Sequence, residues 1–187
     1  MSNTTENVLT KTYRGKFGDQ MVFRNRDGMS IMAKLPKKNM KPVAESQLAV
    51  RRRFKMACRW AKQALLDPDN LAEYAALASG MKTPYIMAVT NYLRPPEVRE
   101  IIASGYTGEA GNKINVVASD DFKVTGVTVK IIDASGMLIE EGPCQENLLA
   151  DCWVYTTTVA IASLAGIVIT AQAKDIPCHT ASLSITL

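Results

Sequence analysis

The feature that most constrains this fold is a succession of short strand-like segments from about residue 112 to the last residue. Within residues 122–132, Val127, Val129 and Ile131 alternate with polar side chains. This period of two places one face of a strand in a core and the other in water. The Asp-Ala-Ser-Gly sequence at 133–136 predicts a turn. Further strand-like segments lie at 113–118, 137–141, 152–159, 166–173 and 181–187, a spacing typical of a sandwich.

Three of these segments together resemble bacterial immunoglobulin-like domains. They are residues 127–136, 153–156 and 169–175. The resemblance implies an antiparallel β-sandwich over residues 109–187. It also implies a binding or spacer module of the kind found in surface and virion proteins.

The first 43 residues predict a basic extended arm and a β-hairpin. Residues 21–25 and 29–35 are rich in apolar side chains and flank the turn sequence Arg26-Asp27-Gly28, a strong hairpin signal. Residues 7–20 are expected to be extended without a local partner. Because an isolated hairpin is marginally stable in water, this segment should dock on its own sandwich, its own helices or another copy. The candidate self-assembly residues are Tyr13, Phe17, Val22, Phe23, Ile31 and Leu35.

A second resemblance covers this part of the chain. The glycine-lysine-aromatic-glycine sequence at 15–18, followed by Gln47, Arg51 and Phe54, is similar to an uncharacterised family of the Bacteroidota. That family pairs such a hairpin with a helix carrying a Gln…Arg-x-x-Phe pattern. The similarity implies a bacterial or phage origin and no particular activity.

Residues 44–108 predict a helical segment. A basic helix is expected over 44–66, with an apolar stripe formed by Leu48, Phe54, Cys58, Ala61 and Leu65. Further helices are expected at 70–78, 84–92 and 97–103, the last because Pro95-Pro96 and acidic Glu97 match the rules for a helix start. The complete fold class is therefore α+β.

Charge is distributed very unequally along the chain. Residues 1–65 contain 15 Lys and Arg against 4 Asp and Glu, whereas residues 66–187 contain 7 against 14. The basic half is suited to nucleic acid, to an acidic surface, or to the acidic half of a neighbouring copy.

The basic helix carries the candidate nucleic-acid residues. Cationic side chains on one helix neutralise phosphates, and a flanking tryptophan can stack on a base. The alternatives are self-association through this face, or a solvated basic surface with Phe54 and Trp60 packed beneath it. The candidates are Arg51, Arg52, Arg53, Lys55, Arg59 and Trp60.

No pattern in the sequence predicts a catalytic, cofactor or metal site. The single histidine, His179, is expected to be exposed near a turn, and hydrolytic triads and zinc sites are difficult to build without more histidines. Asp120-Asp121 and Glu140-Glu141 are expected to be solvated rather than to bind calcium. The four cysteines, Cys58, Cys144, Cys152 and Cys178, are expected to be reduced, with a disulfide from Cys152 to Cys144 or Cys178 only in an oxidising compartment.

These observations favour a non-enzymatic structural subunit of a homomeric assembly, joined through its N-terminal arm. A filament, a virion or an injection machine would be an assembly of this kind. The alternative is a nucleic-acid-binding protein that uses the basic helix. A weaker third hypothesis is an adhesion-type sandwich that binds carbohydrate or protein at its loops. No signal peptide, membrane span or small-molecule substrate is predicted, so synthesis in the cytoplasm is expected, with the protein becoming part of a virion or an extracellular assembly.

Overall fold

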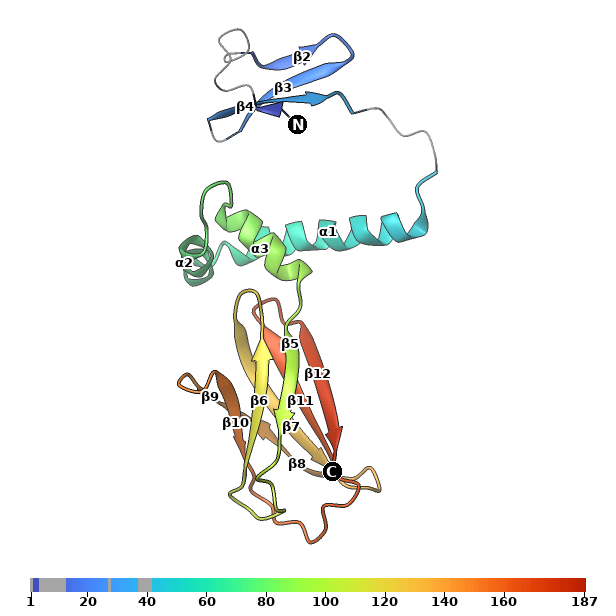
Figure 1. The fold of residues 1–187 in the computed structure, drawn as a ribbon, viewed down its shortest axis with the longest axis vertical. Coiled ribbons are helices and arrows are strands. Elements are labelled where there is room, and N and C mark those ends of the chain that lie inside the picture. The colour runs from blue at the N-terminus through green and yellow to red at the C-terminus, as the bar shows by residue number, and fades with distance from the viewer. Residues whose placement is uncertain (1, 4–12, 27, 37–41) are drawn as a thin grey trace.

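The computed structural model describes residues 2–3, 13–26, 28–36 and 42–187. Within these residues the chain forms three helices and three four-stranded antiparallel sheets. Figure 1 shows the N-terminal sheet at one end of the long axis, the helices in the middle and the other two sheets at the far end. The expectation of a mixed α+β fold is confirmed.

The N-terminal sheet has the strand order β1-β4-β3-β2. Strands β3 and β4 form the predicted hairpin, with Arg26 opposite Met29. Gly28 in its turn has a φ of +74°, a conformation that glycine adopts at no steric cost. The bounds are β1 Ser2–Asn3, β2 Gly15–Phe17, β3 Met21–Arg26 and β4 Met29–Lys34.

The expectation that residues 7–20 have no local partner is wrong for their C-terminal part. Strand β2 pairs antiparallel with β3, and Lys16 lies opposite Val22. A turn over residues 18–20 folds β2 back on β3, and Gly18 enters it with a φ of +56°. Residues 7–12 of the predicted arm lie outside the described residues.

Three of the predicted helices are confirmed. They are α1 Glu45–Ala64, α2 Pro68–Ala76 and α3 Pro84–Leu93. The side chain of Asp67 accepts a hydrogen bond from the Asp69 amide at 3.0 Å, which caps the start of α2. Thr83 caps α3 in the same way by accepting from the Ile86 amide.

The fourth predicted helix, at 97–103, is wrong. Residues Glu97–Ile102 form strand β5, which pairs antiparallel with β6. The register shifts between Val98 and Glu100, and a bulge of this kind changes which side chains face inward. Val98 and Ile101 are consequently both buried although they are three residues apart, a spacing that imitates a helix.

The C-terminal part consists of two facing sheets, β5-β6-β10-β9 and β12-β11-β7-β8. Their shared core takes side chains from both sheets, for example Ile114 and Val116 from one and Ile131 and Ile169 from the other. The predicted alternation in β7 is confirmed, because Val127, Val129 and Ile131 are all buried. The remaining bounds are β6 Lys113–Ser119, β7 Val124–Ile132, β8 Leu138–Pro143, β9 Gln145–Asn147, β10 Cys152–Thr156, β11 Val168–Asp175 and β12 Thr180–Thr186.

A second, smaller core lies between the helices. Ala57 and Ala61 of α1 pack there with Tyr74 of α2 and with Ala88 and Val89 of α3. Neither core contains a described residue of the N-terminal sheet. That sheet is therefore a separate layer, attached to α1 through residues 35–44.

Candidate self-association surface and the junction between helices and sandwich

One face of the N-terminal sheet carries its aromatic side chains. Strand alternation and pairing place Phe17, Met21 and Phe23 on this face, with Met32 opposite Phe23. Tyr13 adds to it, because its ring centroid lies 5.9 Å from that of Phe23. Tyr13 is 57% exposed and Phe17 is 64% exposed. We call this group of side chains the aromatic face.

The opposite face of the same sheet is mixed apolar and cationic. Alternation places Val22 and Ile31 there, with Lys16 opposite Val22 and Arg24 opposite Ile31 on neighbouring strands. Leu35 follows β4, and its amide donates to the carbonyl oxygen of Gln20 at 2.8 Å. All six candidate self-assembly residues thus lie in or beside this sheet, divided between its two faces.

The N-terminal half of α1 is the second uncovered apolar surface. Val50, Phe54, Ala57 and Ala61 recur at spacings of four, three and four, which places them in one stripe. Ala57 and Ala61 are fully buried, whereas Val50 is 68% exposed and Phe54 is 53% exposed. In Figure 1 the start of α1 extends beyond α3. Phe54 is therefore not packed beneath the basic surface, as one of the alternatives expected, and Leu48 of the predicted apolar stripe is 39% exposed as well.

The basic residues of α1 do not all occupy one surface. Arg51, Lys55 and Arg59 follow one another at a spacing of four and are exposed along one side of the helix. Arg52 and Lys62 are also exposed and lie close to that side. We call these five residues the basic face.

Arg53 and Trp60 have partners inside the chain. The Arg53 guanidinium donates to the carbonyl oxygen of Leu93 at 2.7 Å, at the C-terminal end of α3, where cations are favoured. The Trp60 ring packs against Tyr74 and Tyr92, with centroid distances of 6.3 and 5.7 Å. The structure therefore places four of the six candidate nucleic-acid residues in the basic face, Arg53 at the C-terminal end of α3 and Trp60 against the helical core.

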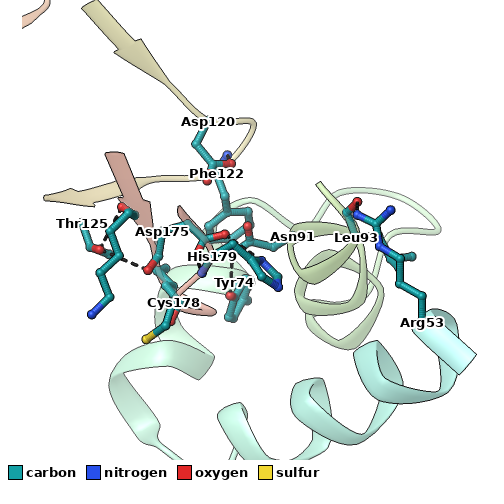
Figure 2. Close-up of polar contacts among 12 residues, drawn as sticks. Arg53, Tyr74, Asn91, Leu93, Asp120, Phe122, Thr125, Asp175, Cys178 and His179 are labelled. Atoms are coloured by element: carbon teal, nitrogen blue, oxygen red, sulfur yellow. Dashed lines mark hydrogen bonds and ion pairs between the residues drawn. The ribbon is translucent and has the colours of Figure 1, made fainter. Parts of the chain in front are cut away.

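Aromatic packing joins the helices to the sandwich (Figure 2). Phe122, in the loop between β6 and β7, lies with its ring 4.3 Å from that of Tyr74. Tyr74 is buried, and its hydroxyl accepts a hydrogen bond from the Asn91 side chain at 2.8 Å. Burial is the main reason that the pKa of Tyr74 is raised, so its phenol remains a neutral hydrogen-bonding group.

His179 belongs to the same junction, contrary to the expectation that it is freely exposed. Its amide and its Nδ1 lie 2.6 and 3.1 Å from the two carboxylate oxygens of Asp175. The Asp175 side chain is completely buried at the end of β11, and its carboxylate orients the imidazole edge-on to the Tyr92 ring, 4.7 Å away. This arrangement positions a loop of the sandwich against α3.

Two ion pairs surround the aromatic contacts. Arg94 pairs with Asp121, and Lys123 pairs with Glu73 of α2 at 2.7 Å. Asp120, beside them, accepts a hydrogen bond from the Phe122 amide. Burial, together with the charges of Asp175 and Asp121, raises the pKa of Asp120.

A buried polar cluster lies at one edge of the sandwich core. Glu140 was expected to be solvated, but it is buried and accepts hydrogen bonds from the Thr158 amide and hydroxyl at 2.8 and 2.7 Å. The Tyr155 hydroxyl donates to the same carboxylate at 3.2 Å. Burial and the nearby carboxylate raise the pKa of Tyr155 to about 12. These contacts hold β8 against β10 across the two sheets.

The remaining candidate chemistry is sparse. All four cysteines lie in the described residues and are free thiols, and burial raises the pKa of Cys144 to about 12. Among the described residues, no group of three or more His, Cys, Asp or Glu gathers in an arrangement suited to a metal ion. No helix in the described part of the chain is long and apolar enough to cross a membrane.

No protein-family model and no curated protein matches this sequence.

Proposed function

We propose that this protein is a non-enzymatic structural subunit that assembles with copies of itself through its N-terminal sheet. The observation that carries the proposal is that no described apolar side chain of this sheet is buried in a core, since neither hydrophobic core includes any part of it. A β-sheet becomes stable by burying one face against another element. A neighbouring copy supplies that element in a homomeric assembly.

The exposed side chains support the same proposal. Two exposed apolar surfaces lie before and after residues 35–44 in the sequence. Tyr13 and Phe17 are exposed on the sheet, and Val50 and Phe54 are exposed on α1. Burying a large apolar side chain contributes about 1.5–3 kcal/mol. Association that covers these four residues therefore gains several kilocalories per mole before the entropy of association is subtracted.

We further propose that the C-terminal sandwich is immunoglobulin-like. With β5 to β12 read as strands A, B, C, C′, D, E, F and G, the sheet orders become A-B-E-D and G-F-C-C′. These are the orders that define immunoglobulin-type sandwiches. In the assembly this unit acts as the rigid body that the N-terminal sheet connects.

The proposal is tested by measuring the mass of the purified protein across a range of concentrations. Size-exclusion chromatography with light scattering should give a mass above that of the monomer, increasing with concentration. A chain that begins at Lys41 should be monomeric. Full-length protein that remains monomeric at every concentration, with residues 1–40 cleaved readily by protease, would refute the proposal.

Two point variants test whether association depends on the aromatic face or on exposed apolar side chains in general. Phe17→Ser should weaken association. Met137→Ser should not, although Met137 is also exposed and lies in the turn between β7 and β8. Equal effects of the two substitutions would show that the association is non-specific.

The second candidate function is nucleic-acid binding through the basic face. The observation in its favour is that Arg51, Lys55 and Arg59 are exposed along one side of α1. The triple substitution of these three residues by Ala should then abolish an affinity for DNA or RNA that decreases steeply with salt. Arg53 and Trp60 remain unchanged in this test because both have partners inside the chain.

A further inference from the structure

An acidic cleft beside the β9–β10 turn is the strongest candidate for the surface that receives the N-terminal sheet. The cleft has a volume of about 390 Å³ and lies between the β6–β7 loop and strands β9 and β10. Phe122 and Trp153 form part of its wall, and Asp120, Glu146 and Asp151 supply carboxylates. Lys123 also lines it, but its ammonium group is paired with Glu73. The cleft therefore carries an excess of negative charge.

The turn at the rim of this cleft holds two leucines in water. Leu148 is 82% exposed, and Leu149 is fully exposed. The Asn147 side chain accepts a hydrogen bond from the Leu149 amide at 3.2 Å, and the Asn147 carbonyl accepts from the Ala150 amide. Asp151 completes the turn with a φ of +49°. The backbone of the turn is thus fixed by hydrogen bonds, while its two apolar side chains have no cover.

The N-terminal sheet presents chemistry complementary to the cleft, with cations and aromatic side chains on opposite faces of β2. Tyr13 and Phe17 are exposed apolar groups, and Arg14 and Lys16 between them are exposed cations. Among the strands that the structure describes, β2 lies at the edge of its sheet and β9 lies at the edge of its own. Each is three residues long, with Lys16 at the centre of one and Glu146 at the centre of the other. Edge strands of this kind accept a further strand through their unpaired backbone groups.

We propose that the β2 edge of one copy docks at the β9 edge of a second copy, with Arg14 and Lys16 facing the cleft carboxylates and Tyr13 and Phe17 covering Leu148 and Leu149. The inference rests on the proposed function, since it names the surface on which self-association occurs. The occupant is a second copy because, within one chain, Figure 1 shows the helices between the N-terminal sheet and β9. The contact joins two different surfaces, so it is heterologous and propagates into a ring or a filament.

Charge reversal on each side tests this contact. The cleft variant is Glu146→Lys with Asp151→Asn, because asparagine tolerates the positive φ of Asp151. The sheet variant is Arg14→Glu with Lys16→Glu. Each variant alone should associate on the order of ten- to a hundredfold more weakly than the unaltered protein, since attraction is replaced by repulsion. An equimolar mixture of the two should associate again, because each reversed surface meets a complementary one.

The outcomes distinguish this inference from the proposed function. If the unaltered protein does not associate, both are wrong. If it associates, and removal of residues 1–40 abolishes association while the cleft variant has no effect, the sheet docks elsewhere and only the docking site is wrong. Failure of the mixture to restore association also overturns the docking site. Unchanged thermal unfolding of both variants excludes misfolding, and Leu148→Ser with Leu149→Ser provides a test that does not depend on charge.

Discussion

Trp60 and Arg59 are neighbours in α1 with very different surroundings. The Trp60 ring contacts Tyr74 and Tyr92, whereas Arg59 is exposed in the basic face. Removal of a packed aromatic ring leaves a cavity that the surrounding residues fill only in part. Trp60→Ala should therefore lower the free energy of unfolding by about 3 kcal/mol, whereas Arg59→Ala should change it by less than about 0.5 kcal/mol. Urea unfolding of both variants measures the difference, and similar values would contradict the packing described for Trp60.

Asp120 provides a prediction about pH. Because its pKa is raised in the folded protein, the folded state holds this proton more tightly than the unfolded state. Ionisation of Asp120 therefore disfavours folding at neutral pH, and the penalty disappears as the pH decreases below the ordinary pKa of an aspartate. Asp120→Asn keeps an oxygen to accept from the Phe122 amide and has no charge. It should raise the melting temperature at pH 7 and have little effect near pH 3.

The control for this experiment is Asp133→Asn. Hydrogen bonds from Ser135 and Met137 lower the pKa of Asp133, so its carboxylate form favours the folded state. This substitution should lower the melting temperature at pH 7, with a loss that shrinks as the pH decreases. A shift in the same direction for both variants would contradict the stated environment of Asp120.

At single positions, some contacts follow from the sequence and others do not. Adjacent residues of a strand face opposite sides, so one of Glu140 and Glu141 had to face inward, and the sequence contained that signal. The four-residue spacing of Asp175 and His179 around a proline turn also indicated a local contact. The ring of Tyr92 against His179 could not be foreseen, because the two residues are far apart in the sequence and meet only in the folded protein.

At the scale of elements, regular patterns were predictable and irregular ones were not. The hairpin of β3 and β4 follows from its turn residues and α1 from its apolar period. A helix is predicted over β5 because Pro95-Pro96 and Glu97 match the rules for a helix start, and the bulge leaves Val98 and Ile101 at a spacing that does not contradict a helix. The pairing of β2 with β3 was missed because the turn at 18–20 lacks the Asp-Gly sequence that identifies the next one.

The two halves of α1 give a prediction about this element. Val50 and Phe54 continue the stripe of Ala57 and Ala61, but only the second pair is buried. Replacing Val50 and Phe54 together with Ser should leave the unfolding free energy of the monomer within about 1 kcal/mol, since ordinary surface substitutions have small effects. Ala61→Leu, about two turns beyond Phe54 along the same stripe, should lower it by about 1–3 kcal/mol through overpacking. Comparable destabilisation by both changes would show that the first half of α1 is covered.

For the whole molecule, the helices and the sandwich form one body because the β6–β7 loop inserts an aromatic ring between them. Phe122→Ala removes the ring that contacts Tyr74. Amide hydrogen exchange in α2 and α3 should then accelerate, while β7 and β11 in the sandwich core remain protected. Arg99→Ala is a suitable control, since its ion pair with Glu97 spans 3.9 Å between exposed groups. Unchanged exchange in the helices would show that other contacts suffice to hold them.

The distribution of charge gives the last prediction. The first 65 residues carry a net charge of +11 and the remaining residues a net charge of −7, so head-to-tail contact between copies brings opposite charges together. Salt screens such attraction, with a Debye length that decreases from about 10 Å at 0.1 M to about 3 Å at 1 M. The association constant should therefore decrease over this range without vanishing, because the apolar side chains of the aromatic face still contribute. Analytical ultracentrifugation at several salt concentrations measures this dependence. Association that strengthens steadily with salt would mean that apolar contact alone drives assembly and that the acidic half of the neighbouring copy is not the receiving surface.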